Sequence, residues 1–229
     1  MARPPKALIL RDAVVEASLR IIDTDGLDAF SLPRLARELN VQAPSLYHHF
    51  EDKAEILRAV ARAIVLDVRV PEPKSVPNWI EWFVALGLSF REAALRHRNA
   101  VPLLMQYLPR DVMTRSYESG AEYLLELGVP ADQVVTIIDG LDILALGAIV
   151  GSAARGHDDS VRPFARVDAK AEPELAKAAK ANKRSTTAVF AEVIRSFLRG
   201  ALPDVPENAP PPHTWGRPVV DGAEGERTL

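Results

Sequence analysis

The sequence predicts an all-α protein, with an N-terminal three-helix helix-turn-helix domain joined by a long helix to a larger helical domain. Residues 31–53 have the pattern of two short helices separated by a tight turn and followed by the start of a third. Apolar residues recur at helical spacing through most of the remaining chain. Pro71 and Pro73 interrupt that spacing, so the expected domains are residues 1–70 and 71–202.

The two short helices are expected to leave one polar face free. Ser31 is placed to cap the first helix with its hydroxyl group, and Asn40 tolerates the left-handed conformation that ends a helix. The second helix is expected over Ala43–Phe50, with Leu46 and Phe50 directed inward. Its opposite face carries hydrogen-bonding groups, as a helix that enters the major groove of DNA requires.

Residues 35–57 (LARELNVQAPSLYHHFEDKAEIL) resemble the DNA-binding signature of the tetracycline-repressor (TetR) family. The similarity extends over about residues 9–62. Two positions depart from the family pattern, since Asn40 replaces the usual glycine and Gln42 replaces a common serine. The features that match are Leu35, Ala36, Val41, Leu46, Tyr47, Phe50 and Lys53.

The resemblance implies contacts with a double-stranded DNA operator. Gln42 can form paired hydrogen bonds to adenine, and Ala43 can touch a thymine methyl group. Lys53 opposes the helix dipole in the first turn of the third helix, which favours a phosphate partner. The implied phosphate contacts are Tyr47, His49 and Lys53; the implied base-facing residues are Gln42, Ala43, Pro44, Ser45 and His48; Ser31 and Arg34 are expected near the DNA backbone. Residues 2–7 are expected to form an arm that reaches DNA or a frayed terminus.

Composition excludes several kinds of site. The 229 residues include no cysteine, so disulfides and thiolate zinc sites are impossible, and no metal or cofactor is expected. Residues 1–66 hold nine basic and nine acidic residues within a chain of net charge −3, which favours site-specific over non-specific DNA binding. No glycine-rich phosphate loop or clustered carboxylates are present, so an enzyme is not expected. The longest uncharged apolar run, Ile143–Ala154, is too short to span a membrane, and a cytoplasmic protein is expected.

Residues 77–127 gather two Trp, two Phe, two Met and three Tyr. Each of these residues, taken alone, is expected to belong to the helical core. Together they can line an apolar cavity. The resemblance favours a small-molecule effector pocket, and Leu104 and Gly151 stand where a tetracycline-binding member holds its metal chelate through His and Glu. The expected effector is therefore apolar or aromatic and binds without metal. Its expected contacts are Trp82, Phe83, Leu86, Phe90, Leu104, Met105, Tyr107, Met113, Tyr117 and Ile143.

The end of the chain is expected to form a homodimer interface followed by a tail. Two apolar helices, at about residues 131–154 and 187–199, are implied by the resemblance to pair with their copies in a four-helix bundle. The expected interface residues are Gly147, Gly151, Phe190, Ile194 and Phe197. Residues 155–171 are expected to form a loop and residues 172–182 a short helix, while the Pro- and Gly-rich residues 203–229 are expected to be disordered.

These patterns favour a ligand-responsive transcriptional repressor that binds a palindromic operator as a homodimer. A small apolar or aromatic effector would release it from DNA. The alternative is a dimeric DNA-binding regulator, repressor or activator, that is controlled by a protein partner and has no small-molecule pocket.

Overall fold

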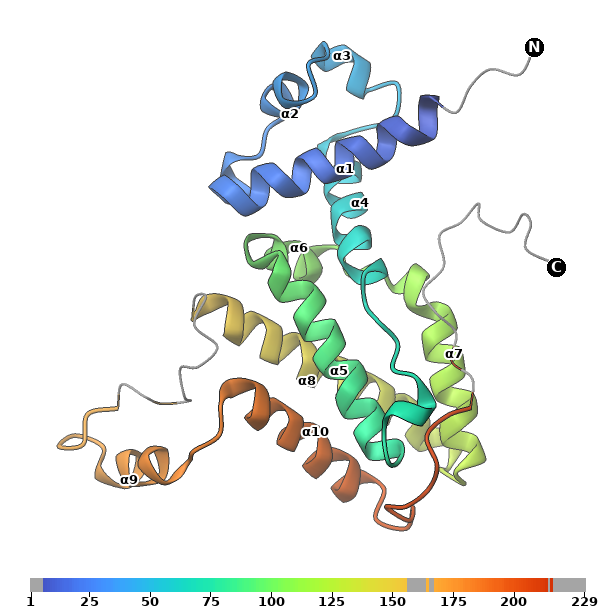
Figure 1. Cartoon of the computed structure of the whole chain (residues 1–229), viewed down its shortest axis with the longest axis vertical. Coiled ribbons are helices and arrows are strands. Elements are labelled where there is room, and N and C mark those ends of the chain that lie inside the picture. The colour runs from blue at the N-terminus through green and yellow to red at the C-terminus, as the bar shows by residue number, and fades with distance from the viewer. Residues whose placement is uncertain (1–5, 156–163, 165–166, 214, 216–229) are drawn as a thin grey trace. The chain divides into compact units, whose positions relative to one another are not determined.

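The computed structural model describes residues 6–155, 164, 167–213 and 215, with side chains from residue 11 onward. Every regular element in these residues is helical, which confirms the all-α prediction (Figure 1). The α-helices are α1 (Lys6–Asp25), α2 (Leu32–Glu38), α3 (Ala43–Leu46), α4 (Lys53–Leu66), α5 (Trp79–Arg96), α6 (Val101–Gln106), α7 (Arg110–Glu126), α8 (Ala131–Ala154), α9 (Pro173–Ala181) and α10 (Thr186–Ala201). Short 3-10 turns are η1 (Leu27–Ala29), η2 (Pro73–Ser75) and η3 (Arg98–Ala100).

Parts of three expected segments fall outside these residues. The expected N-terminal arm is helical from Lys6 onward, and its first residues, with Arg3, are not among those described. The same holds for residues 156–163 of the expected loop and residues 216–229 of the expected tail.

The chain divides into two compact units, and the division passes through α5 and α7. Unit 1 contains residues 6–68 and 92–116, whereas unit 2 contains residues 69–91 and the described residues from 117 to 215. The sequence analysis placed residues 92–116 in the second domain. The structure groups them with the N-terminal helices instead.

Side-chain contacts with α1 explain why residues 92–116 join unit 1. Nδ2 of Asn99 donates hydrogen bonds to the backbone oxygens of Ile22 and Asp23, at 3.1 and 3.0 Å. Nδ1 of His97 lies 2.8 Å from Oδ2 of Asp23. The last carbonyl groups of a helix lack partners within it, so these donors stabilise the end of α1. Because Asn99 follows α1 by more than seventy positions, no local sequence pattern indicates the contact.

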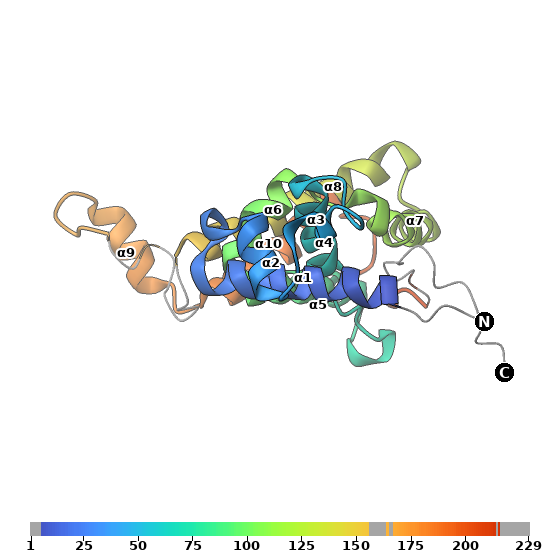
Figure 2. The same cartoon turned by 90° about the horizontal axis from the view of Figure 1, so that it is seen from above.

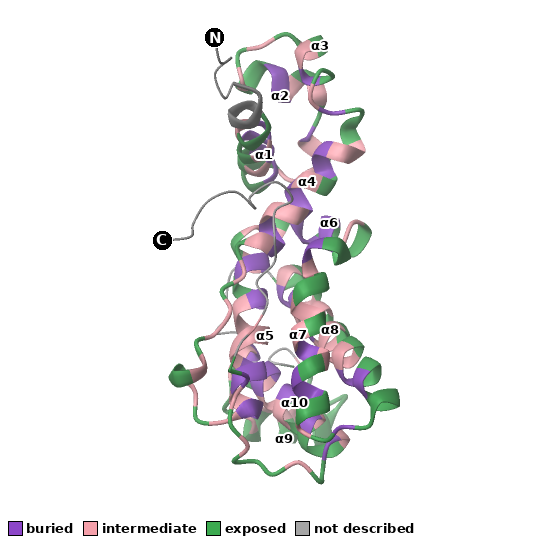
Figure 3. Cartoon of the chain, turned by 90° about the vertical axis from the view of Figure 1, so that its right-hand side faces the viewer, coloured by how far each residue is buried: buried purple, intermediate pink, exposed green. Residues whose placement is uncertain are grey.

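Close helix packing defines the core of unit 2. A Cβ atom at Gly87 of α5 would lie 2.7 Å from Cδ1 of Ile194 in α10, so glycine permits this approach. Gly140 of α8 similarly faces the ring of Phe197, where a Cβ would lie 2.5 Å from Cζ. The buried residues of α5 and α10 are visible in Figure 3. These contacts use apolar faces that the sequence analysis partly assigned to a second subunit.

Asn78 caps the start of α5. Its Oδ1 accepts a hydrogen bond from the backbone N of Glu81 at 3.0 Å. The carboxylate of Glu81 accepts from Nε and Nη2 of Arg195 at 2.6 and 2.8 Å. Hydrogen bonding to Arg195 outweighs partial burial and holds the pKa of Glu81 below its usual value. A bidentate ion pair therefore joins α5 to α10.

Residues 203–213 are not disordered, contrary to the sequence prediction. The backbone oxygen of Pro206 accepts from Nε1 of Trp79 at 3.0 Å, and that of Pro210 accepts from the hydroxyl group of Tyr123 at 2.5 Å. Prolines cannot donate backbone hydrogen bonds, but their carbonyl groups accept them. Composition alone therefore indicated disorder, because the donors that order this segment lie far away in the sequence.

Two helices of unit 2 leave apolar side chains exposed. By length and hydropathy alone, α8 qualifies as a membrane-spanning helix. In this structure 22% of its apolar 18-residue stretch is buried. Its exposed residues include Val135, Ile143 and Val150. Helix α9 stands away from α8 and α10 of the same unit in Figure 2, and it has no buried residue.

The approach of α5 to α10 gives a stability prediction. We expect Gly87→Ala to lower the free energy of unfolding by about 1–3 kcal/mol, because the added methyl group must displace the fully buried Ile194. Gly200→Ala in α10 is the control, since a Cβ there meets no atom within 4 Å. Urea unfolding followed by circular dichroism measures both changes. Equal stability of the two variants would contradict the proposed close packing.

Candidate nucleic-acid interface

The turn between α2 and α3 has the expected backbone conformation. Asn40 adopts a φ of 52°, which is the left-handed conformation predicted for this position. The N–H of Val41 then donates to the carbonyl group of Ala36 at 2.9 Å, closing the end of α2. An asparagine side chain is tolerated there, so the glycine usual in the family is not required.

The expected side-chain cap of α2 is absent. Ser31 occupies the N-cap position with an extended backbone, but its hydroxyl group accepts no capping hydrogen bond. Pro33 stands in the first turn and has no N–H, which removes one of the amides that a cap can bind. The same explanation applies to Gln42 ahead of α3, because Pro44 follows it.

Helix α3 is shorter than predicted. Its α-helical part ends at Leu46, and residues 47–49 form turns instead of the expected helix to Phe50. The inward direction of Leu46 and Phe50 is as predicted, since the two side chains are only 2% and 3% exposed. Buried apolar side chains therefore anchor this segment at the end of the helical turn and at the end of the turns that follow it.

The opposite face of this segment is accessible, as Figure 3 shows for the region around α3. Tyr47 is 57% exposed. Gln42, Pro44 and His48 are also exposed, while Ala43, Ser45 and His49 are half-buried. The structure thus brings the seven predicted residues between 42 and 49, which exclude the buried Leu46, onto one short surface segment.

The two predicted cations of this region have partners within the chain. Nζ of Lys53 donates to the backbone oxygen of Phe30 at 2.9 Å and lies 5.4 Å from the centroid of its ring. Arg34 forms an ion pair with Asp25. Exposed ion pairs contribute little stability, so a DNA phosphate can replace Asp25 as the partner of Arg34 at small cost.

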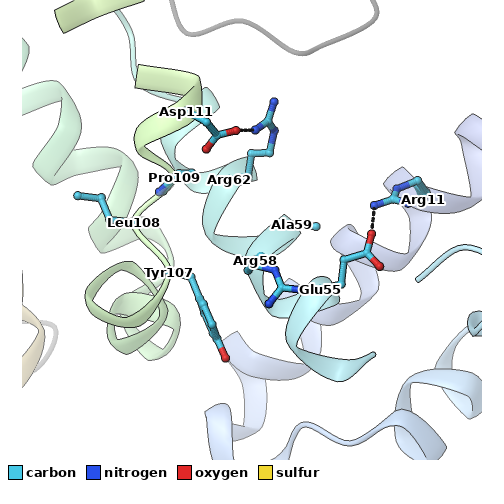
Figure 4. A pocket seen from close by; sticks show the side chains of 9 residues that line it. All are labelled: Arg11, Glu55, Arg58, Ala59, Arg62, Tyr107, Leu108, Pro109 and Asp111. Carbon is cyan, nitrogen blue, oxygen red and sulfur yellow. Dashed lines mark hydrogen bonds and ion pairs between the residues drawn. The ribbon is translucent and has the colours of Figure 1, made fainter. Parts of the chain in front are cut away.

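Arg11 of α1 fixes the turn that follows α3, and sequence reasoning missed this role. Its Nη1 donates to the backbone oxygen of His49 at 2.6 Å, and its Nη2 donates to Oε1 of Glu55 at 2.7 Å. Its guanidinium group also lies 4.3 Å from the ring centroid of Phe50. Figure 4 shows Arg11 reaching Glu55 from the neighbouring helix. An arginine far away in the sequence carries no local signal for such a contact.

Glu55 completes the start of α4. Its backbone N donates to Oδ1 of Asp52 at 2.6 Å, and its Oε2 accepts from the backbone N of Glu51 at 2.6 Å. Asp52 thus caps the helix, and the carboxylate of Glu55 binds the backbone N–H of the residue before the cap. Burial opposes the charged form of Glu55, but the hydrogen bonds from Glu51 and Arg11 outweigh it and hold its pKa below the ordinary 4.5.

A pocket of about 420 Å³ lies beside these residues (Figure 4). Arg58 and Arg62 contribute to its wall together with Tyr107 and Asp111. Arg62 pairs with Asp111, and an Nη atom of Arg58 lies 3.7 Å from Asp52. Acidic partners within unit 1 therefore offset the positive charge of both arginines.

The ten predicted effector-contacting residues do not gather in one unit. Leu104, Met105, Tyr107 and Met113 belong to unit 1, and the other six belong to unit 2. Met105 and Ile143 are 58% and 63% exposed in the single chain. Trp82, Phe83, Phe90 and Leu104 are buried, while Leu86, Tyr107, Met113 and Tyr117 are half-buried.

The predicted dimer residues are also distributed differently. Phe190 and Ile194 are 5% and 1% exposed within a single chain, so they form its core and not a free surface. Phe197 is half-buried against Gly140. Gly147 is exposed with open space around its Cα, whereas Gly151 is half-buried beside Arg155. An apolar helix face packs equally well inside a subunit, so periodicity could not separate the two cases.

The lowered pKa of Glu55 gives a pH-dependent prediction. A carboxylate whose folded pKa lies below its unfolded value stabilises the protein above the unfolded value, and this contribution is lost as the pH falls through the folded pKa. We therefore expect Glu55→Gln to lower the melting temperature at pH 7 and to have a much smaller effect at about pH 3. Glu16→Gln, at an exposed position of α1, is the control. An equal effect of Glu55→Gln at both pH values would show that its charge is not involved.

Comparison with known proteins identifies the family. Residues 14–60 match the model of "Bacterial regulatory proteins, tetR family". The chain is 26% identical over 152 residues to the tetracycline repressor protein class A from transposon 1721 of Escherichia coli, covering 66% of this chain and 70% of that protein. It is 32% identical over 159 residues to the transcriptional repressor DrrR1 of Streptomyces coeruleorubidus, covering 66% and 55%.

Solved structures agree with this result. The TetR family protein ActR of Streptomyces coelicolor, in complex with (S)-DNPA, is similar with a TM-score of 0.64 and 26% identity. The similarity covers 83% of this chain and 96% of ActR. The turn geometry, the exposed α3 surface and these similarities agree: this chain belongs to the tetR family of bacterial regulatory proteins and is a DNA-binding transcriptional regulator.

Proposed function

We propose that the protein is a homodimeric, ligand-responsive transcriptional repressor that inserts the segment around α3 into the major groove of its operator. The observation that carries this proposal is the accessible surface of residues 42–49, held from behind by Leu46 and Phe50. A recognition helix needs this combination, because it must expose polar groups while remaining fixed to its domain.

Within this surface, roles can be divided by side-chain chemistry. Gln42 and Ala43 begin the segment, and their side chains suit contacts with base edges. Pro44, Ser45 and His48 are proposed to face the bases with them. Tyr47 and His49 suit phosphates, and Lys53, Arg34 and Ser31 lie at the flanks. In a two-fold symmetric dimer, two such surfaces would contact a palindromic operator with half-sites about 34–36 Å apart, or a multiple of that distance.

The exposed face of α8 supports the proposed homodimer. Val135, Ile143, Gly147 and Val150 recur at helical spacing and are all exposed in the single chain. An apolar stripe of this kind is typical of a protein–protein contact in a soluble protein. We place the second subunit against this stripe, and Gly147 would allow the two backbones to approach closely. Phe190 and Ile194, buried inside the chain, are left out of this interface.

A small apolar or aromatic effector is the proposed signal. Unit 2, with its aromatic residues, is the proposed effector-binding part, and the helix-turn-helix of unit 1 is the proposed DNA-binding part. The ActR structure, whose ligand is (S)-DNPA, supports an organic effector for a relative with this fold. Such a molecule can release DNA only if it binds more tightly to the conformation that does not fit the operator. A cytoplasmic location follows from this role.

Tyr47→Ala tests the proposed DNA-binding surface. We expect it to lower operator affinity about tenfold, which corresponds to the loss of about 1.4 kcal/mol of contact energy. Fluorescence anisotropy with DNA flanking the protein's own gene, or with DNA obtained by selection, measures the affinity. Because Tyr47 is 57% exposed, the melting temperature should not change. Leu175→Ala in α9 is the control, and operator binding that survives Tyr47→Ala would show that the surface is misplaced.

Ile143→Asp tests the proposed dimer. A charge at this 63% exposed position costs nothing in a monomer but would be buried without a partner in the interface. We expect sedimentation velocity to show a dimer for the wild type and a single chain for the variant. Met105→Asp, at another exposed apolar position, should remain dimeric. A dimeric Ile143→Asp variant would exclude this face of α8.

A further inference from the structure

The aromatic cluster of unit 2 is formed by Trp79, Trp82, Phe83 and Tyr123, and the indole ring of Trp215 completes it. The rings of Trp82 and Trp215 have centroids 4.3 Å apart and are tilted by 48°. Phe83 meets Trp215 edge-on, with centroids 6.0 Å apart and planes at 85°. The edge-to-face pair of Phe83 and Trp215 is a favourable arrangement of aromatic rings, and the tilted ring of Trp82 lies close to the same indole.

Gly120 of α7 leaves room for this ring. A Cβ atom at Gly120 would lie 3.1 Å from Cη2 and 3.8 Å from Cζ2 of Trp215, which is tighter than an ordinary contact. The six-membered ring of the indole therefore lies directly against the backbone of α7. A flat aromatic group fits between this backbone and the ring of Trp82.

The segment that delivers Trp215 is anchored before it reaches the cluster. Backbone oxygens of Pro206 and Ala209 accept from Nε1 and the backbone N of Trp79, at 3.0 and 3.2 Å. The oxygen of Pro210 accepts from the hydroxyl group of Tyr123. All of these anchors precede Trp215 in the sequence. The indole ring can consequently leave the cluster while residues 206–210 remain in place.

Within the described part of the chain, the indole N–H of Trp215 lacks the hydrogen bond that the other two tryptophans form. Nε1 of Trp79 and Nε1 of Trp82 each donate a hydrogen bond at 3.0 Å, to the backbone oxygens of Pro206 and Pro71. Nε1 of Trp215 is buried and finds no acceptor among the described residues. Burying a donor without a partner is unfavourable, because its hydrogen bond to water is lost. The site matches the shape of the indole ring but not its N–H group.

We propose that this aromatic cluster is a binding site for a flat, apolar, two-ring aromatic molecule, and that Trp215 is the chain's own occupant, which such a molecule displaces. A ring without a donor would fill the same space and avoid the unpaired N–H. This inference rests on the proposed function in one respect only, which is that the displacing molecule is taken to be the effector. Binding and displacement themselves require no DNA.

Naphthalene and indole form the matched pair of probes, since they are close in size and only indole carries an N–H. In equilibrium dialysis with the full-length protein, we expect naphthalene to bind about tenfold more tightly than indole, because the unpaired donor is costly. Trp215→Ala should bind naphthalene about tenfold more tightly than the wild type, if Trp215 occupies the site about nine-tenths of the time. His213→Ala, at an exposed position of the same segment, should equal the wild type. Equal naphthalene affinity of Trp215→Ala and the wild type would overturn the proposal.

Displacement is measured in the wild type itself, so the test does not depend on how well Trp215→Ala folds. With 5-fluorotryptophan incorporated, the three tryptophans give three fluorine resonances, and Trp215→Phe identifies that of Trp215. Saturation with naphthalene should move this resonance to the position found in the unfolded chain, while Trp79 and Trp82 stay folded. A Trp215 resonance that does not move at saturation would refute displacement.

Anisotropy with operator DNA in the same samples separates this inference from the proposed function. Operator binding combined with a Trp215 that naphthalene cannot displace would reject the inference and leave the repressor proposal intact. Displacement of Trp215 in a protein that binds no selected DNA would support the site and reject the repressor.

Discussion

A helix of a single turn is not stable alone, and the proposed DNA-binding surface depends on overcoming that constraint. Nucleating a helical turn fixes several residues for one hydrogen bond, so α3 must be held by contacts outside itself. Leu46 and Phe50 provide apolar burial, and Arg11 binds the carbonyl group of His49 directly behind them. The position of Tyr47 and His48 therefore depends on α1 and α4 as much as on α3. The accessible side chains of residues 42–49 are thus held in place partly by residues outside that segment.

Local sequence patterns predicted those features that local chemistry determines. The left-handed Asn40 and the inward Leu46 and Phe50 depend on neighbouring residues, and the structure shows all of them. The cap expected at Ser31 failed for an equally local reason, since Pro33 removes a donor.

Features that depend on distant residues were missed or assigned wrongly. Residues 203–213 looked disordered because their partners, Trp79 and Tyr123, lie elsewhere in the sequence. The apolar face of α10 was assigned to a second subunit, although Gly87 lets α5 cover it within the same chain. For α10 the sequence showed that an apolar face needed a partner but not which one. The DNA-binding turn was easier to locate, because its spacing is short and its residues are contiguous.

The distribution of tryptophan has a practical consequence. All three tryptophans lie in unit 2, and two of their rings are in contact with each other. Intrinsic tryptophan emission therefore originates wholly from unit 2, and unit 1 contributes no indole signal. A change in emission on adding a small molecule would report an event in the proposed effector-binding part, with no added dye and no DNA. Conversely, a single tryptophan introduced in place of Tyr47 would give the DNA-binding surface an optical signal of its own.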